Sequence, residues 1–409
     1  MNRLKTIIFI GTNKSGSSRE AIKAAEQLGY STIVFTNNEK QIMQREEYTD
    51  VHEMILIDTD NLSAMKEEIH KLRARGRDIK TIVSFVDSYV YTASILCDEF
   101  CQNPASSKAI GIMENKEDTR SVLKGKFYTP KYFVIRPKES FKFRIIKLLL
   151  SYPVIVKSPK STGSKDVLLA ENGEKLEKHI ARFQERNEED TVIIEEYIDG
   201  DQYLVEALVY NKKIQLAGII EQEITHGKRF IITGYGVLAN VPDDIKAGIE
   251  EVVSSVVTQL GIINGALHLE LRRTKNGWKL IEINPRISGG AMNKMLKAAF
   301  GYNLAEETLK LYLGEVPSIV PRTKKYVFTQ YVIVSKKGIL EKVTGKKRAR
   351  KSPGVVEVYV KPKRGTRLIP PLSMGHRYAY VIATGESIQE AKELAKNAAD
   401  EITFHLREE

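Results

Sequence analysis

The chain has 409 residues, of which 42% are hydrophobic, so it holds enough apolar material for about two to four packed units rather than one core. No run of about eighteen apolar residues is present, which excludes an ordinary membrane-spanning helix, and the N-terminus lacks a secretory pattern. Cys97 and Cys101 are expected to be buried free thiols rather than zinc ligands, which indicates a reducing, cytoplasmic compartment.

The net charge of +11 is concentrated in two basic stretches, residues 346–354 and 361–367. Such stretches can bind nucleic acid, but these two lack interleaved aromatic residues that would stack on bases. We therefore expect a solvated loop and no nucleic-acid partner. Nucleic-acid binding through these stretches stays open as an alternative function.

Strand and helix patterns alternate over residues 1–108, which predicts a parallel sheet in a Rossmann-like unit. Its glycine loop, GTNKSGSS, has Gly11 and Gly16 at the spacing of a phosphate-binding loop. Ser17, however, stands where that loop requires a lysine. The loop therefore predicts a tight turn from strand to helix.

Residues 109–190 predict a small α+β unit, with a helix over 140–150 and a strand that ends at Lys157. Strands dominate residues 191–286, where one helix is expected at 243–260. A single helix should follow Arg286 and end near 312–317, before a C-terminal part with hairpin strands and a late helix. The predicted domains are 1–108, 109–190, 191–319 and 320–409.

Residues 265–290 read as a β-hairpin with polar side chains on alternate positions. A two-residue loop at Asn276-Gly277 would place Glu270 and Glu282 on opposite faces. A three-residue loop, Lys275 to Gly277 with its glycine in the left-handed conformation, places the two glutamates opposite each other on one face. We expect the second register because it alone separates an apolar face from a polar one. The apolar face would comprise Leu269, Leu271, Ile281 and Ile283, and His268 would oppose Asn284.

Two carboxylates placed directly opposite each other repel, at a cost of about 0.2–1 kcal/mol, and burial would raise one pKa unless a cation lies nearby. Glu270, Glu282 and Asn284 offer the hard oxygen ligands that Mg²⁺ prefers, completed by nucleotide phosphates. Arg286, on the same face, could meet developing negative charge. The alternative is a polar strand that faces solvent.

Other segments supply parts of a nucleotide site. Lys157 precedes SPKSTGSKD, a loop whose backbone N–H groups can cover phosphates. The segment TVIIEEYIDG, residues 191–200, predicts a strand followed by a linker that can present backbone groups to an adenine edge. Lys116, in ENKEDTR, is a second cation upstream.

Taken together, these residues and the motif LIEINPRISGG resemble the ATP-grasp ligases over most of the chain. Within that group, this motif and the tail SMGHRYAYVIATGESIQEAKE are most similar to L-amino-acid ligases that make dipeptides. The resemblance implies an ATP-grasp fold of the α/β and α+β classes. It would comprise a Rossmann-like N-terminal domain, two α+β halves that clasp ATP, and a C-terminal α+β subdomain.

The resemblance also implies cofactors and residue roles. The cofactors would be ATP and one or two Mg²⁺ ions, for which Mn²⁺ can substitute. Glu270, Glu282 and Asn284 would hold the metal, and Arg286 and Lys157 would act in catalysis. The residues expected to bind ATP are Lys116, Lys157, Ser161, Gly163, Ser164, Glu195, Glu196, Tyr197, Ile198 and Gln202.

The implied reaction joins two amino-acid substrates into a dipeptide through an aminoacyl phosphate, a chemistry used in antibiotic biosynthesis. Asp87, at the C-terminal end of a predicted strand, could pair with arginine as the first substrate, although a helix N-cap is an equal alternative. The other expected substrate residues are His226, Tyr235, Gly289 and Gly290.

Two departures from the family pattern concern the substrates. Asp201-Gln202 stands where many relatives have a ribose-binding glutamate, so the role of Gln202 stays open. The stretch from Ile232 to Tyr235 replaces a Glu-Thr-Gly-His motif, which leaves substrate identity open. A carboxylase-type enzyme acting on bicarbonate and an inactive ATP-binding regulator are further alternatives, and the sequence does not decide whether a homodimer forms.

Overall fold

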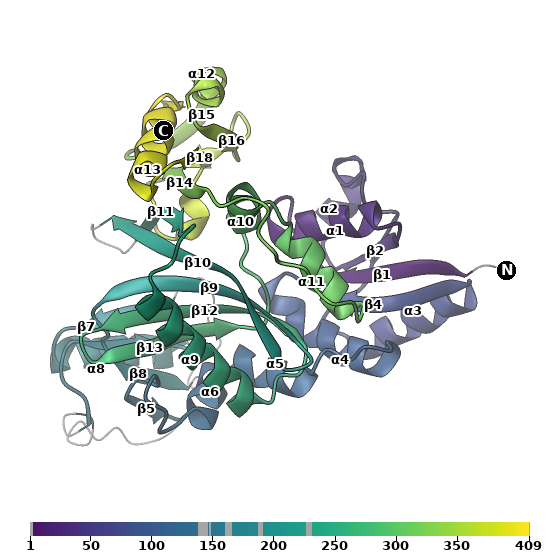
Figure 1. The fold of residues 1–409 in the computed structure, drawn as a ribbon, viewed down its shortest axis with the longest axis horizontal. Coiled ribbons are helices and arrows are strands. Elements are labelled where there is room, and N and C mark those ends of the chain that lie inside the picture. Colours follow the sequence, from purple (N-terminus) through teal and green to yellow (C-terminus); the bar gives the residue numbers. More distant parts are fainter. Residues whose placement is uncertain are drawn as a thin grey trace.

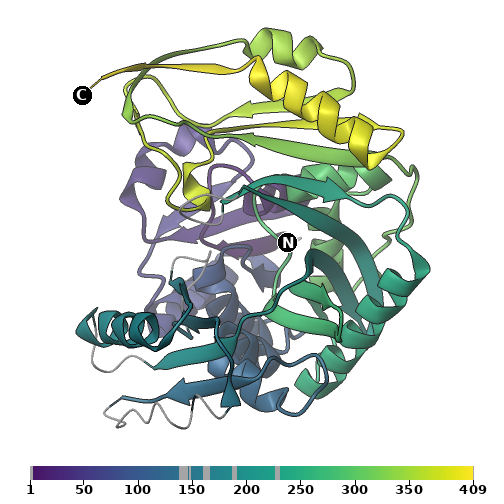
Figure 2. The same ribbon diagram turned by 90° about the vertical axis from the view of Figure 1, so that its left-hand side faces the viewer.

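The computed structural model describes residues 3–137, 146, 149–159, 166–186, 191–225 and 231–408. Figure 1 shows three lobes: the N-terminal sheet, a lobe that holds β5 to β8 beside the start of a long sheet, and a C-terminal lobe. Figure 2 shows from a second direction that the C-terminal lobe lies above the other two.

The N-terminal lobe is a four-stranded parallel sheet in the order β3-β2-β1-β4. The helices between its strands pack on a core of branched apolar side chains, which confirms the predicted Rossmann-like arrangement. The strands are β1 (Leu4–Ile10), β2 (Ser31–Thr36), β3 (Glu53–Leu56) and β4 (Arg77–Val83). The helices are α1 (Ser17–Gln27), α2 (Glu39–Met43), α3 (Leu62–Ala74) and α4 (Val90–Phe100).

The glycine loop is a strand-to-helix turn, as predicted. Gly11 has a φ of +67° and lies under the Tyr89 ring, where a Cβ would clash. Gly16 precedes α1 with a φ of +87°, and a Cβ there would lie 3.0 Å from the backbone nitrogen of Gly290. Both positions therefore require glycine, and the second brings the turn against the far end of the candidate site.

The next lobe follows α5 (Ser107–Glu114) and α6 (Lys116–Val122). Its four strands are ordered β5-β8-β6-β7 and share a separate core with α8 (Gly173–Arg186). The strands are β5 (Tyr132–Ile135), β6 (Val154–Lys157), β7 (Val167–Ala170) and β8 (Val192–Glu196). β8 thus lies beyond the predicted boundary at 190 but pairs with β5 and β6. The helix expected over 140–150 falls largely outside the described residues.

An eight-stranded sheet, in the order β13-β12-β9-β10-β11-β14-β18-β16, joins the second lobe to the third. Its first five strands in chain order are β9 (Asp201–Tyr210), β10 (Lys213–Thr225), β11 (Ile231–Val237), β12 (Gly265–Thr274) and β13 (Gly277–Asn284). The last three are β14 (Tyr326–Val332), β16 (Val355–Val360) and β18 (Ala379–Gly385). The sheet is continuous across residue 319, where a domain boundary was predicted.

Helices and a small sheet complete these lobes. α9 (Asp243–Leu260) matches the predicted helix and packs its apolar side chains into the main core. In the C-terminal lobe, α13 (Ile388–Asp400) lies on the long sheet, beside a second sheet of three strands. These are β15 (Gly338–Thr344), β17 (Arg367–Leu368) and β19 (Thr403–Arg407).

Two expectations about helices are wrong. The single helix expected after Arg286 is two helices, α10 (Met292–Phe300) and α11 (Leu304–Tyr312). Gly301 ends α10 in the left-handed conformation, with a φ of +82°, and the Asn303 side chain caps α11. The basic stretch expected to be a loop forms α12 (Lys346–Lys351), whose Arg348 pairs with Glu401 at 2.6 Å.

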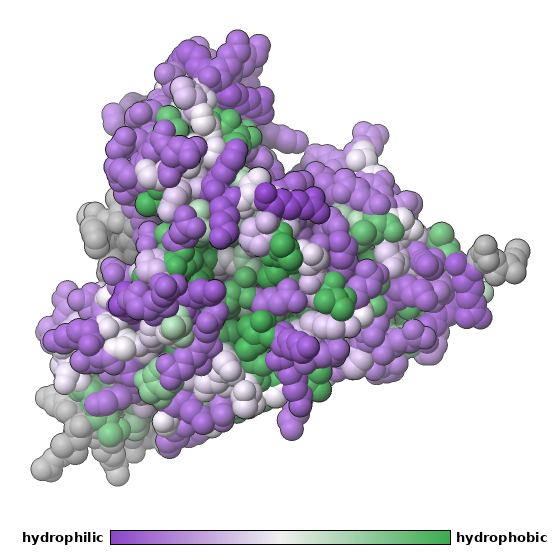
Figure 3. Space-filling model, viewed as in Figure 1, coloured by the Kyte–Doolittle hydropathy of each residue, from purple (hydrophilic) through white to green (hydrophobic). Residues whose placement is uncertain are grey.

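In the face shown in Figure 3, apolar residues gather where the N-terminal lobe meets the long sheet, whereas the outer surfaces of the lobes are hydrophilic. One core cluster includes residues of both regions, so they pack as a continuous body. Cys97 is buried and Cys101 is half-buried, both as free thiols. Among the residues described, no helix has the length and apolar character required to cross a membrane.

Candidate active site

The hairpin of β12 and β13 carries the two acids at its centre. Glu270 pairs directly with Glu282, and His268 pairs with Asn284. Because side chains of directly paired residues project to the same side of a sheet, the two carboxylates face the same way. The predicted register is therefore confirmed at the positions that matter for the site.

The turn of this hairpin differs from the predicted one. Thr274 pairs with Gly277, so the loop contains two residues, Lys275 and Asn276, rather than three. Gly277 has the expected positive φ, +102°, but it already belongs to the strand. A two-residue turn alone would not place the acids opposite each other.

A β-bulge between Glu270 and Leu271 restores the register. Ile281 is the additional residue on the opposite strand, so it is displaced from the apolar face. Fully buried Leu280 takes its place, which corrects the predicted set. The bulge also turns the carbonyl of Ile281 toward the Arg120 guanidinium, which donates to it at 2.7 Å.

The paired acids are only partly neutralised. The ammonium group of Lys116 lies 3.2 Å from Glu282 Oε1, and Gln202 Nε2 donates to Glu270 Oε2 at 2.9 Å. Burial, and then the charge of Glu282, raise the pKa of Glu270 above its ordinary value. A protein cation therefore relieves part of the repulsion, and the pair still favours an additional positive charge.

A second charged centre is fully buried. Lys157 Nζ donates to Glu195 Oε2 at 2.7 Å, and Arg120 Nε donates to Glu195 Oε1 at 2.7 Å. Burial opposes ionisation of Glu195, but these two cations outweigh it and lower its pKa to about 2. Burial also lowers the pKa of Lys157. The predicted ATP ligands Lys157 and Glu195 therefore bind each other.

The linker after β8 leaves the backbone N–H of Ile198 available. The N–H of Tyr197 donates to Pro153 at 3.3 Å, and the carbonyl of Ile198 accepts from Arg272. The N–H of Ile198 donates to no atom of the described residues, which suits an acceptor on an adenine edge. The Glu196 carboxylate accepts from the backbone of Lys131 at 2.8 Å, so its side chain is bound on the opposite strand.

Gln202 joins this linker to the acids. Its side-chain oxygen accepts from Arg272 Nε at 3.0 Å, while its nitrogen donates to Glu270. The Gln202 side chain therefore bridges Arg272 and Glu270 within the protein, whereas the sequence suggested a contact with ribose.

A buried carboxylate on β9 supports the hairpin on the same face as the acid pair, because Glu206 pairs directly with His268. Glu206 Oε1 lies 2.6 Å from His268 Nδ1, and the N–H of Ser288 donates to Glu206 Oε2 at 3.1 Å. Burial disfavours both charged forms, but the neighbouring imidazole lowers the pKa of Glu206 and the carboxylate raises the pKa of His268. This contact holds the segment after Arg286 against the hairpin.

Arg286 contacts the N-terminal lobe. Its Nε donates to Asp87, the first residue of a 3₁₀ helix (Asp87–Tyr89) after β4. The side chain of Asp87 is 36% exposed, against 14% for Arg286. The structure therefore brings a predicted substrate residue against a predicted catalytic residue, although they are far apart in sequence.

The remaining predicted substrate residues divide into two groups. Tyr235 lies on β11, 5.9 Å between ring centroids from Tyr331 of β14. Gly289 and Gly290 are exposed at the end of the hairpin segment, beside Gly16. The residues Ser161, Gly163, Ser164 and His226 lie outside the described residues.

The side-chain oxygens of Glu270, Glu282 and Asn284 are of the kind that a hard divalent cation prefers. Glu270 and Glu282 supply two carboxylates on one face, and Asn284 continues the same strand two residues on. Within the described part of the chain, no group of three or more His, Cys, Asp or Glu side chains could hold a metal. Two carboxylates with an amide are compatible with Mg²⁺ that retains other oxygen ligands, such as phosphate.

Four residues of this region were not assigned roles from the sequence. Arg120 follows Lys116 by one helical turn and therefore shares its face, a signal that was available. Glu206 is a lone acid in the apolar strand YLVEALVY, which also marks it. Arg272 continues the alternation of the polar face. Arg377 lies near Tyr235 without any local pattern to indicate it.

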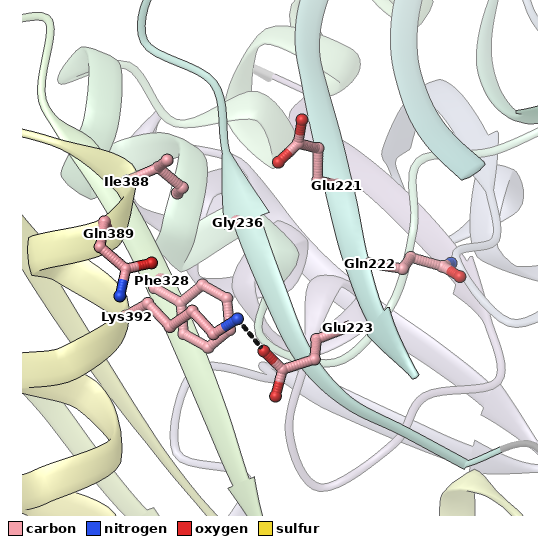
Figure 4. Close-up of a pocket in the computed structure, with 8 residues that line it drawn as sticks. All are labelled: Glu221, Gln222, Glu223, Gly236, Phe328, Ile388, Gln389 and Lys392. Atoms are coloured by element: carbon pink, nitrogen blue, oxygen red, sulfur yellow. Dashed lines mark ion pairs between the residues drawn. The ribbon is translucent and has the colours of Figure 1, made fainter. Parts of the chain in front are cut away.

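A cavity of about 240 Å³ lies elsewhere, between the long sheet and α13 (Figure 4). Glu221 pairs with Tyr203, and Tyr203 projects away from the face that carries Gln202, so the cavity is on the other side of the sheet. Glu223 is neutralised there by Lys392 and by Lys396 at 2.7 Å. The cavity is therefore separate from the acid pair.

Three parts of the chain match known families. Residues 150–294 match the ATP-grasp domain, and residues 22–100 match the ATP-grasp N-terminal domain. Residues 330–407 match the L-amino acid ligase C-terminal domain 2.

Individual relatives are distant. The chain is 24% identical to the uncharacterized protein y4rH of Sinorhizobium fredii, over 87% of this chain and 74% of that protein. It is 22% identical to the L-arginine-specific L-amino acid ligase of Bacillus subtilis, over 64% of each chain, and thus spans less than two thirds of that enzyme.

The crystal structure of the L-amino acid ligase from Bacillus licheniformis covers all of both chains with a TM-score of 0.81 at 18% identity, which shows a shared fold. The predicted fold is thereby confirmed. The chain contains an ATP-grasp domain with its N-terminal domain and a C-terminal domain of the L-amino acid ligases, and these matches indicate an ATP-dependent carboxylate–amine ligase.

Proposed function

We propose that the protein joins two L-amino acids into a dipeptide. A carboxylate oxygen of the first amino acid attacks the γ-phosphorus of ATP, and ADP leaves. The amine of the second attacks the resulting acyl carbon, phosphate leaves with its bridging oxygen, and the amine loses a proton. The observation that carries this proposal is the pair of opposed glutamates beside Lys116, on the hairpin that leads to Arg286.

The hairpin residues would hold the metal and the reacting phosphate. Glu270, Glu282 and Asn284 would bind one or two Mg²⁺ ions, or Mn²⁺ in their place. Bound Mg²⁺ would supply positive charge to the phosphates of ATP and to the two carboxylates. Lys116, 3.2 Å from Glu282, would share its charge between that carboxylate and a phosphate.

The nucleotide would lie between the second lobe and the hairpin. The available N–H of Ile198 suits adenine, and the loop after Lys157 is proposed to cover the phosphates. Because Glu195, which Arg120 also binds, holds the Lys157 ammonium group, the position of that group is set before ATP binds. Such preorganisation reduces the rearrangement required at the moment of reaction.

Arg286 would stabilise the acyl phosphate and the tetrahedral intermediate. Its contact with Asp87 orients the guanidinium from the N-terminal lobe. Asp87 is exposed enough to face a second cation, which supports arginine as the first substrate. We therefore propose a cationic first amino acid, in line with the specificity named for the Bacillus subtilis relative.

A panel of amino acids tests this function. Single amino acids and pairs are incubated with ATP and Mg²⁺, with phosphate release and product mass as readouts. We expect stoichiometric phosphate and dipeptide from pairs, and the greatest rate with arginine as the first substrate. Phosphate release that depends on bicarbonate and needs no amino acid would instead indicate the carboxylase-type reaction.

A further inference from the structure

A row of tyrosine rings crosses the C-terminal half of the long sheet, on β11, β14, β18 and β16. Tyr235 and Tyr331 have centroids 5.9 Å apart, Tyr331 and Tyr380 are 5.8 Å apart, and Tyr380 and Tyr359 are 5.2 Å apart. These strands are neighbours in the sheet, so the rings line one continuous surface. The first two rings lie at the end nearest the candidate active site.

Arg377 lies on these first two rings. Its guanidinium carbon is 3.9 Å from the centroid of Tyr331 and 5.6 Å from that of Tyr235. Nη1 donates to the Tyr235 hydroxyl and to the Ile232 carbonyl, each at 3.4 Å, and Nε donates to the Met374 carbonyl at 3.2 Å. Every one of these partners is neutral, so the positive charge is not cancelled.

Three of the other sheltered arginines meet a carboxylate, whereas Arg272 and Arg45 donate to neutral groups. Arg19 pairs with Asp50, Arg120 with Glu195, and Arg286 with Asp87. No acidic side chain lies within 4.0 Å of Arg377 among the described residues, and its Nη2 donates no hydrogen bond to them. A half-buried guanidinium held only by neutral groups is suited to an anionic ligand.

The position of this cation relates it to the reaction. The Tyr331 hydroxyl lies 3.6 Å from where a Cβ on Gly290 would be. Gly290 ends the segment that begins at Arg286, and Glu206 holds that segment to the acid hairpin through Ser288. Arg377 is therefore on the C-terminal side of the same segment, whereas the acids and Lys116 are on the other side.

We propose that Arg377, framed by Tyr331 and Tyr235, binds a carboxylate on the acceptor amino acid, the one whose amine attacks the acyl phosphate. This rests on the ligase function proposed above. The Nη2 group keeps its N–H donors for a carboxylate oxygen, and the tyrosine rings keep the guanidinium from turning. The ligand carboxylate is either the α-carboxylate or an acidic side chain, and the experiment separates the two.

The test compares acceptors that differ only in charge. With the amino-acid pair that the panel identifies as best, one arm replaces the acceptor by its α-carboxamide. The other arm compares glutamate with glutamine and aspartate with asparagine as acceptors. In one of these two arms, the wild-type protein should show a kcat/KM for the charged acceptor that is about 10- to 100-fold higher than for its neutral amide. A factor of this size is expected for a hydrogen bond between an arginine and a carboxylate.

Arg377→Met should bring that preference close to one, mainly through a higher KM for the acceptor, and Arg377→Lys should retain part of it. Arg364→Met removes an exposed arginine of the same lobe and should leave the preference unchanged. Because each preference is a ratio within one protein, a loss of folded material does not alter it.

Two failures are distinguishable. A protein that ligates amino acids while Arg377→Met keeps the wild-type preference in both arms overturns this inference alone. An unchanged protein that forms no dipeptide from any pair overturns the proposed function, and the acceptor site with it.

Discussion

The protein contains two carboxylate centres that are balanced in opposite ways. At the first, the single carboxylate of Glu195 meets two cations, Lys157 and Arg120, within a closed interior. At the second, the two carboxylates of Glu270 and Glu282 lie beside Lys116, which is 3.2 Å from Glu282, and His268, which is 4.0 Å from Glu270. The pKa of Glu195 is lowered to about 2, whereas that of Glu270 is raised, first by burial and then by its neighbour.

The difference in charge balance indicates that the Glu195 centre has a structural role and that the pair of Glu270 and Glu282 has a functional one. The centre at Glu195 already has its partners, so it contributes to folding and positions Lys157. At Glu270 and Glu282 the negative charge is not fully balanced by protein cations. Such an imbalance is typical of a functional site, where a bound ligand can supply the missing positive charge. Substitutions at the two centres should therefore affect different properties.

The largest expected effect is on stability at the first centre. Glu195→Gln leaves the charges of Lys157 and Arg120 buried without their carboxylate, which should lower the free energy of unfolding by about 3–5 kcal/mol. Urea titration of both proteins measures this change. A loss below about 1 kcal/mol would show that the two cations find other partners.

The second effect is on activity at the acid pair. Glu282→Gln should lower kcat by about 10²- to 10³-fold, since it removes charge that binds the metal and its phosphates. The free energy of unfolding should change by less than about 1 kcal/mol because the substitution also removes repulsion. If Glu282→Gln lowered the free energy of unfolding by as much as it raised the activation free energy, the acid pair would have a structural role as well.

The third effect is the pH dependence of stability, which should have opposite signs at the two centres. The stabilisation from Glu195 is fully present above its ordinary pKa of 4.5 and is lost as pH falls toward its folded value of about 2. That shift corresponds to a contribution on the order of 3 kcal/mol. The unfolding free energies of the wild type and Glu195→Gln should therefore converge below pH 4.5.

At the acid pair, stability should depend on pH with the opposite sign, because the pKa of Glu270 is raised. The folded state holds that proton more tightly, so the associated stabilisation is present below the ordinary pKa and is lost as pH rises through the folded value. Relative to the wild type, Glu282→Gln should become more stable as pH rises above 4.5. If the difference in unfolding free energy between the wild type and Glu282→Gln did not depend on pH, the repulsion between Glu270 and Glu282 would be contradicted.

The comparison also shows how far sequence reasoning reaches. Alternation along the hairpin predicted that Glu270 opposes Glu282, because a one-residue slip would have moved a whole apolar set to the wrong face. The bulge was not visible, since Leu280 and Ile281 are both apolar and either could fill the core. The break at Gly301 was missed because apolar positions continue on both sides of it.

Contacts between distant segments could not be predicted. Lys116 reaches Glu282, Asp87 reaches Arg286, and Arg377 reaches Tyr235 only after the lobes have packed. No periodicity within one strand or helix encodes such pairings. The sequence therefore indicated most groups on the hairpin and few of the groups that other lobes bring to it.

The central claim is that the opposed acids bind Mg²⁺ together with ATP. Calorimetric titration with Mg²⁺ and a non-hydrolysable ATP analogue tests it without requiring turnover, using the wild type, Glu282→Gln and, as an exposed-acid control, Glu250→Gln. We predict Mg²⁺-dependent nucleotide binding by the wild type and the control, and a loss of about tenfold or more for Glu282→Gln. Binding that Glu282→Gln leaves unchanged would contradict the account.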